Sequence, residues 1–259
     1  MPFATNPADG VRIYYEVVGS GKPVAMLHGM TATRDSWRRH GFADLVRHGY
    51  QLILIDARSH GESDKPYDPG SHGGLTAMAA DTVAVLDDAS IDRAHVIGYS
   101  MGASTSYVLA SNAPDRILSL VLGGGPHTLP EAWVQGLAGV LDQGPEALLA
   151  MFETSLGELE PERRDEILQL DTKSVAAAAA ASIESISQDD FAELSVPCLL
   201  YVGADDELAF AQIQHIAELM PNAELHILPG LDHSRAARES QQMLPKVLEF
   251  FERVEAEGR

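Results

Sequence analysis

Residues 93–104, which read Arg-Ala-His-Val-Ile-Gly-Tyr-Ser-Met-Gly-Ala-Ser, constrain the fold more than any other part of the chain. The residues before Ser100 predict a short buried strand, and those after it predict a helix packed on that strand. A strand that turns into a helix within about one residue forces the corner residue into a strained backbone with positive φ. Gly98 and Gly102 fit this geometry, because a Cβ at either position would collide where the two elements approach closely. The sequence therefore predicts an exposed serine hydroxyl at a corner, beside the backbone N–H of Met101 at the helix N-terminus.

The acidic composition restricts the classes of partner. The chain of 259 residues has 18 basic and 38 acidic residues, so its net charge is 18 − 38 = −20. Such a surface repels nucleic acid and anionic membranes, so neither is an expected partner, and the charge itself is explained by solubility. The length fits one large α/β domain with a sizeable core.

The chain carries no pattern of a secreted, membrane or metal-binding protein. Its single cysteine, Cys198, excludes an intrachain disulfide and a cysteine-based zinc site, and its strand-like surroundings predict a buried thiol. Residues 1–10 lack the basic start and the apolar stretch of a signal peptide. No run approaches the ~18 apolar residues that a membrane span needs. We therefore expect a cytoplasmic protein.

Apolar runs alternate with amphipathic stretches over most of the chain. Besides the strand before Ser100, strands are expected at residues 11–18, 24–27, 51–56, 117–122, 196–203 and 223–228. Helices are expected at residues 35–48, 75–89, 103–112, 209–220 and 240–255. Because most strands are continuous apolar runs, this order predicts an α/β fold, with a mostly parallel central sheet covered by helices on both faces.

Residues 127–190 break this alternation. No strand is expected there, and helical stretches follow one another at residues 131–141, 145–156, 161–170 and 173–187. We therefore predict a core made of residues 1–126 and 191–259, interrupted by a helical insertion at residues 127–190. The apolar faces of these helices also leave room for a homodimer contact.

The Gly98-x-Ser100-x-Gly102 string in its strand–turn–helix context resembles the nucleophile elbow of the α/β-hydrolase superfamily. The resemblance covers nearly the whole chain outside the insertion, which corresponds to the cap or lid of that superfamily. It implies that Ser100 is a nucleophile and that a histidine must take its proton.

His233 has the setting that such a base requires. It follows the last expected strand in a loop ahead of the final helix, and reactive groups of open sheets collect at the carboxyl ends of strands. The acid comes from the residues after the strand at 196–203, where the superfamily commonly has Gly-x-x-Asp. This places the acid at Asp206, with the adjacent Asp205 as the alternative. The order Ser100, Asp206, His233 is the one expected for the fold.

An oxyanion hole needs two N–H donors. The stretch His28-Gly29-Met30 resembles the superfamily's His-Gly-x motif, so the backbone of Met30 is assigned as the second donor beside Met101.

The loop at residues 56–63 resembles the superfamily's Asp-x-Arg-Gly-His-Gly-x-Ser loop, with Ser59 in place of the usual glycine. Taken alone, Asp56, Arg58 and His60 suggest a metal site. The resemblance instead implies a hydrogen-bonded loop that supports the oxyanion strand, so no metal and no cofactor are expected.

The resemblance implies a serine hydrolase that acts through an acyl-enzyme, on a small or medium, uncharged carboxylic ester. The alternatives are an enol-lactonase, a carbon–carbon bond hydrolase of dienone acids, a perhydrolase and a non-catalytic ligand receptor. Acidic substrates usually require a positioned arginine, and Arg34 is the candidate near the oxyanion loop. Candidates for the pocket wall are aromatic or imidazole side chains near these loops or in the insertion: Trp37, His127, Trp133, Phe152 and Phe210.

Overall fold

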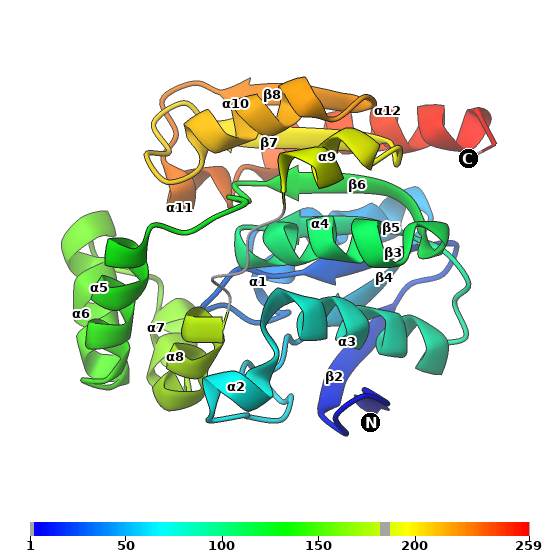
Figure 1. Cartoon of the computed structure of the whole chain (residues 1–259). Coiled ribbons are helices and arrows are strands. Elements are labelled where there is room, and N and C mark those ends of the chain that lie inside the picture. The colour runs from blue at the N-terminus through cyan, green and yellow to red at the C-terminus, as the bar shows by residue number, and fades with distance from the viewer. Residues whose placement is uncertain (1–2, 182–186, 259) are drawn as a thin grey trace.

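The computed structural model describes residues 3–181 and 187–258 and contains one twisted sheet (Figure 1). Its described strands are β1 (Phe3–Thr5), β2 (Arg12–Val18), β3 (Lys22–Leu27), β4 (Tyr50–Ile55), β5 (Ala94–Tyr99), β6 (Ile117–Gly123), β7 (Cys198–Gly203) and β8 (Ala223–Leu228). Their spatial order is β1-β2-β4-β3-β5-β6-β7-β8. Only the pairs β1–β2 and β2–β4 are antiparallel, so the predicted mostly parallel sheet is confirmed.

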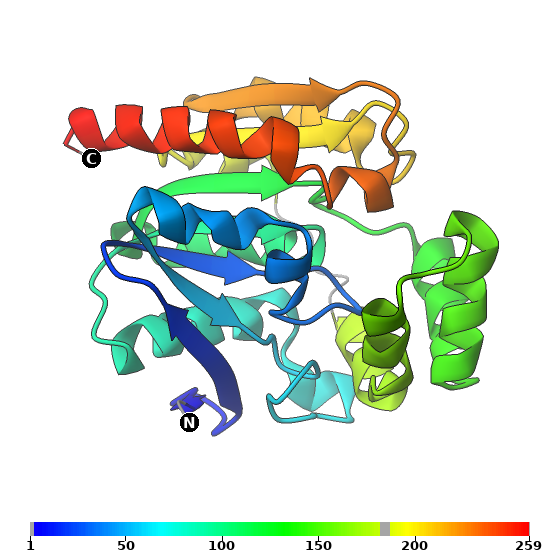
Figure 2. The same cartoon turned by 180° about the vertical axis from the view of Figure 1, so that it is seen from behind.

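Helices cover both faces of this sheet, as predicted. On the face seen in Figure 1 lie α3 (Gly74–Asp88), α4 (Met101–Asn112), α9 (Gln188–Glu193) and α10 (Phe210–Leu219). On the opposite face, seen in Figure 2, lie α1 (Ser36–Arg39), the 3-10 helix η1 (Phe42–His48) and α12 (Ser240–Ala256). A second 3-10 helix, η2 (Pro114–Arg116), connects α4 to β6.

Two apolar clusters explain why the central strands are continuous apolar runs. Neighbouring residues of a strand point to opposite faces, so Val96 of β5 packs in one cluster and Ile97 in the other. Leu120 and Val121 of β6 alternate in the same way. Each such fully buried side chain contributes about 1.5–3 kcal/mol. The sheet is thereby a rigid platform for the loops that follow its strands.

The insertion between β6 and β7 consists of α5 (Glu131–Leu141), α6 (Pro145–Leu156), α7 (Pro161–Leu168) and α8 (Thr172–Ala181). Both views place these helices beyond the carboxyl ends of the parallel strands, to one side of the sheet (Figures 1 and 2). They share an apolar cluster of their own, made of Leu141, Leu148, Leu149, Leu159, Ile167, Leu170 and Val175. The predicted helix at 173–187 extends into residues 182–186, which lie outside the described part of the chain.

Several details differ from the sequence expectations. The predicted helix at 35–48 is divided into α1 and η1, because Gly41 adopts a left-handed backbone with φ of 84°. The four-residue helices α2 (Pro69–His72) and α11 (His233–Ala236) and the strand β1 are too short to show a periodic pattern. Helix α9 crosses residue 190, and its Phe191 packs against Tyr107 of α4 with ring centroids 5.0 Å apart. None of the described helices combines the length and the apolar character needed to cross a bilayer.

Candidate active site

Ser100 occupies the predicted corner between β5 and α4. Its φ of 52° and ψ of −116° confirm the strained, positive-φ backbone expected there. A Cβ on Gly102 would lie 2.0 Å from the carbonyl oxygen of Leu27, and one on Gly98 would lie 2.6 Å from that of Gly102. The two glycines therefore allow α4 to start directly against β3 and β5, which fixes the position of Ser100.

The His233 side chain reaches Ser100 from the other end of the chain. His233 is the first residue of α11, not a loop residue as predicted, and Asp232 caps this helix by accepting from the Arg235 N–H at 2.8 Å. Its Nε2 lies 3.0 Å from Ser100 Oγ, and its Nδ1 lies 2.7 Å from Asp206 Oδ2. The Tyr99 hydroxyl donates to the His233 carbonyl oxygen, so the imidazole is held by its backbone as well.

Asp206 is the carboxylate that meets His233. Its side chain is fully buried, and its Oδ1 accepts from the N–H groups of Leu208 at 3.1 Å and Ala209 at 3.0 Å. Both oxygens are thereby paired, as a buried carboxylate requires. The neighbouring Asp205 is exposed and does not contact His233. The structure thus brings Ser100, His233 and Asp206 together in one hydrogen-bonded chain.

The backbones of Met30 and Met101 flank the serine. Met101 is the first residue of α4, and a Cβ on Gly29 would lie 3.4 Å from Ser100 Cβ, which places the loop after β3 against the serine. Neither the Met30 nor the Met101 N–H has a hydrogen-bond partner within the described residues. Two free donors beside a nucleophile are the arrangement that an oxyanion needs.

Comparisons with known proteins agree with this geometry. The family profile of the alpha/beta hydrolase fold matches residues 22–174, which is more than half of the chain. The chain belongs to the α/β-hydrolase family. This membership makes the protein a hydrolase and explains the order in which its site residues follow one another.

Relatives and solved structures extend the match to nearly the whole chain. A Bacillus subtilis protein, provisionally named a 2-succinyl-6-hydroxy-2,4-cyclohexadiene-1-carboxylate synthase, is 29% identical over 94% of this chain and 96% of the relative. The 2-hydroxy-6-oxononadienedioate/2-hydroxy-6-oxononatrienedioate hydrolase of Burkholderia vietnamiensis is 27% identical over 94% and 92%. The crystal structure of a hydrolase from Pseudomonas aeruginosa superposes with a TM-score of 0.86 and 26% identity, covering 96% of this chain and 97% of the other.

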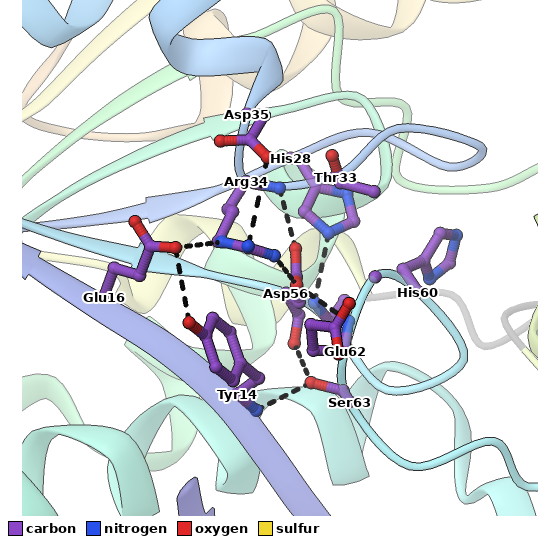
Figure 3. Close-up of polar contacts among 12 residues, drawn as sticks. Tyr14, Glu16, His28, Thr33, Arg34, Asp35, Asp56, His60, Glu62 and Ser63 are labelled. Carbon is purple, nitrogen blue, oxygen red and sulfur yellow. Dashed lines mark hydrogen bonds and ion pairs between the residues drawn. The ribbon is translucent and has the colours of Figure 1, made fainter. Parts of the chain in front are cut away.

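Beside the loop that follows β3, this α/β hydrolase carries a network centred on the buried Asp56 (Figure 3). The Asp56 carboxylate accepts from the backbone and the guanidinium of Arg34 and from the Glu62 N–H. Glu16 Oε1 accepts a hydrogen bond from Arg34 Nε at 2.8 Å. Arg34, the candidate for binding an acidic substrate, therefore has its guanidinium paired with Asp56 and Glu16. It also lines a different cavity from the one that contains Ser100.

Two buried histidines join the same network to the loop that follows β3. His28 Nε2 accepts from the Ala57 N–H at 3.1 Å, and His60 Nε2 accepts from the Thr31 N–H at 3.3 Å. Burial, opposed by Asp56, lowers the pKa of His28, and burial together with His28 lowers that of His60 well below its ordinary value. Both rings are thus neutral and act as hydrogen-bond acceptors. In the described part of the chain, no three His, Cys, Asp or Glu side chains converge as metal ligands would.

Ser59 shows why the superfamily favours glycine at its position. Its φ is 73°, in the left-handed region that costs any side chain some strain. The Ser59 hydroxyl accepts from Ser174 Oγ of α8 at 2.7 Å, so the serine ties this loop to the insertion.

Ser100 lies where two cavities meet. A small one of about 30 Å³ is lined by Met30, Met101, His127 and Trp133, among others. A large one of about 340 Å³ extends from Ser100 and His233 between the core and the insertion, where Trp37, Trp133 and Phe152 line it. Of the predicted pocket residues, only Phe210 lines neither cavity.

Sequence reasoning missed the charged part of the large cavity. Arg39 and Arg238 line it together with Arg163 of α7, although they are far apart in the sequence. No periodicity or motif marks them, because their proximity depends on how α1, α7 and the segment after α11 pack.

Proposed function

We propose that this α/β hydrolase cleaves small or medium carboxylic esters through an acyl-enzyme. The observation that carries the proposal is the continuous hydrogen-bonded chain from Ser100 Oγ through the imidazole of His233 to Asp206. A serine hydroxyl is a weak nucleophile unless an adjacent base takes its proton. His233 is within range to do so, and Asp206 orients the ring for that transfer.

In the first half-reaction, Ser100 Oγ attacks the ester carbonyl carbon while its proton passes to His233 Nε2. Asp206 holds Nδ1–H and stabilises the imidazolium that forms. The carbonyl oxygen becomes an oxyanion between the N–H groups of Met30 and Met101, each worth ~3 kcal/mol in the transition state. The C–O bond to the alcohol then breaks, and His233 returns its proton to the departing oxygen.

In the second half-reaction, water takes the place of the alcohol. His233 removes a proton from the water, whose oxygen attacks the acyl carbon in the same oxyanion site. Collapse of this intermediate breaks the bond to Ser100 Oγ, releases the carboxylic acid and restores the hydroxyl.

The helical insertion, residues 127–190, is proposed to be a cap over a core formed by residues 1–126 and 191–259. Its separate apolar cluster and the position of Trp133 and Phe152 in the wall of the large cavity support this role. A cap that closes over bound ester would exclude water from the oxyanion site, which strengthens its electrostatic interactions.

A second candidate is hydrolysis of an enol lactone or of a carbon–carbon bond in a dienone acid. The same serine and histidine serve these reactions, and the named activity of the Burkholderia vietnamiensis relative belongs to the second class. The arginines that line the large cavity favour this candidate over perhydrolysis, because enol lactones of this kind and dienone acids carry a carboxylate that an arginine can bind.

The test is the replacement Ser100→Ala. We expect it to lower kcat for p-nitrophenyl acetate by about 10⁴-fold or more and to abolish labelling by a fluorophosphonate. Ser106→Ala is the matched control, since Ser106 lies on the same helix, donates to the Gly102 carbonyl oxygen and lines neither cavity. Turnover and labelling that persist in Ser100→Ala would refute the assignment, and an unlabelled wild type would instead indicate a receptor.

A further inference from the structure

The charged side chains that line the large cavity are all positive. Arg39, Arg163 and Arg238 line it, whereas no Asp or Glu from the described part of the chain does so. These arginines, with His40, also line an adjoining hollow, which shows that they gather at one end of the cavity. We call Arg39, Arg163 and Arg238 the arginine cluster.

One carboxylate, that of Glu166, pairs with two members of the cluster. Glu166 Oε2 accepts from Arg39 Nη2 and from Arg163 Nη1, both at 2.6 Å. Arg238 forms no ion pair with any described carboxylate. Glu166 offsets one of the three guanidinium charges, and Glu160 and Glu239 lie in the adjoining hollow, so the described residues in the wall of the cavity that contains Ser100 carry charged side chains of positive sign alone.

One buried donor of the cluster is unpaired. The Nε of Arg39 is buried and has no hydrogen-bond partner within the described residues. Because this Nε is closed off from solvent, a ligand in the cavity does not reach it. The exposed Arg238, which lines the cavity and whose guanidinium has no partner among the described residues, supplies the free donors. Arg163, by contrast, donates to the Thr31 carbonyl oxygen at 2.9 Å and so also braces the oxyanion loop.

The neighbouring His40 reports the same positive potential. Burial, then Arg39, Arg238 and Arg163, lower the pKa of His40 to about 4. The imidazole is therefore neutral near pH 7, and the positive charge of this end comes from the guanidinium groups alone.

We propose that the arginine cluster binds a carboxylate carried by the substrate, so that the preferred ester has an anionic arm in the large cavity. The planar, two-pronged donor pattern of a guanidinium matches a carboxylate. The inference rests on the proposed ester hydrolysis and names its substrate class. It replaces the uncharged ester expected from the sequence.

Two further features define this substrate. The small cavity of about 30 Å³ has room for a group of water or methyl size, so the other side of the scissile bond carries a short apolar group. Since the whole chain has a net charge of −20, long-range forces repel an anion, and a local positive cluster is needed to hold it. Glu160 and Glu239 line only the adjoining hollow and leave the cavity with Ser100 free of carboxylates.

The test compares esters of equal length that differ in one charge. Monomethyl esters of butanedioic to octanedioic acid carry the carboxylate on the acyl side, and their dimethyl esters are the neutral partners. Acetate esters of ω-hydroxy acids and of alkanols form the corresponding pair on the alcohol side. In at least one series we expect wild-type kcat/KM to favour the anionic ester by about 10- to 100-fold, the effect of one charge-assisted hydrogen bond.

Arg238→Gln should remove most of this preference, mainly by raising KM for the anionic esters, whereas KM for the neutral esters should change by a much smaller factor. The exposed Arg238 can be replaced without disturbing the core. Arg47→Gln, which removes an exposed arginine that lines neither cavity, should leave the preference unchanged. A wild type that cleaves neutral esters as well as anionic ones in both series would overturn the inference and leave the proposed ester hydrolysis intact.

A binding measurement separates the two proposals further. Calorimetric titration of the Ser100→Ala protein with hexanedioate needs no turnover. Binding that weakens about 10-fold or more in Ser100→Ala/Arg238→Gln supports the arginine cluster even if no ester is cleaved. Equal binding to both proteins, or no binding to either, counts against it.

Discussion

At the scale of single residues, Asp205 and Asp206 show how one position along the chain changes the chemistry of a carboxylate. Asp206 is buried and holds two backbone N–H groups and the imidazole of His233, whereas Asp205 is exposed. A buried carboxylate is stable only when such partners surround it. The same partners keep Asp206 oriented toward His233.

Asp206→Asn should therefore lower kcat for p-nitrophenyl acetate by about 10⁴-fold, because an amide stabilises the wrong tautomer of His233 and no imidazolium. Asp205→Asn is the matched control and should change kcat by no more than a few-fold. Steady-state kinetics on both proteins, with circular dichroism to show that each is folded, makes the comparison. A larger loss at position 205 would reverse the assignment of the acid.

Residues inside a motif were predictable, and residues outside one were not. Ser100 stands in a string whose glycines have a steric reason, and His233 and Asp206 each follow a recognisable strand. Arg39 and Arg238 follow no such rule, because only the packing of distant elements brings them to one cavity. Arg34 was the sequence candidate instead, and its partners Asp56 and Glu16 became visible only in three dimensions.

At the scale of elements, the contact between α4 and β3 determines where the serine stands. Gly102 is the point of closest approach, with the space for its Cβ filled by the backbone of Leu27. Backbone cannot move aside as a flexible side chain can, so the helix itself would have to shift.

Gly102→Ala should lower the free energy of unfolding by about 1–3 kcal/mol or more, as overpacking does, and should reduce kcat because Ser100 is displaced. Gly136→Ala is the control: Gly136 lies within α5 with nothing within 4 Å of its added Cβ, so the change should stabilise the helix by about 0.5–1 kcal/mol. Urea unfolding of both variants gives the two values. Unchanged stability in Gly102→Ala would show that the contact is looser than described.

Long strands and helices were predicted correctly from the sequence, whereas short ones were not. Buried strands such as β6 and long helices such as α12 carry enough apolar residues to reveal their period. The four-residue α11 does not, and the break at Gly41 between α1 and η1 depends on a single left-handed residue. Short elements are set by tertiary contacts, which a local pattern does not contain.

At the scale of the whole molecule, buried neutral histidines tie the stability of this hydrolase to pH. Burial lowers the pKa values of His72 and His95 to about 4, as it does for His40. Unfolding restores the ordinary value of about 6.5. Below pH 6.5 the unfolded chain therefore binds more protons than the folded one, and stability falls as the pH falls from 6.5 toward 4.

His95 allows this dependence to be tested. It stacks on Phe251 with ring centroids 4.1 Å apart, and its Nε2 lies 3.4 Å from Glu255 without hydrogen-bond geometry. His95→Gln should reduce the slope of unfolding free energy against pH by up to about 1.4 kcal/mol per unit between pH 4 and 6.5. Urea titrations across this range measure the slope. Replacing the exposed His48 with Gln is the control, and an equal change of slope in both variants would contradict the role of burial.

The placement of the insertion has a consequence for how such a protein diversifies. Because β6 and β7 are adjacent and parallel, the chain leaves the sheet after one strand and re-enters it through the next. Helices α5–α8 can thus be replaced by others without changing the order of the strands. The new helices would form a different cavity wall, while Ser100 would keep its position. Arg163 would be lost with these helices, while Arg39 and Arg238 would remain. The affinity of the cavity for an anion would therefore decrease without being abolished.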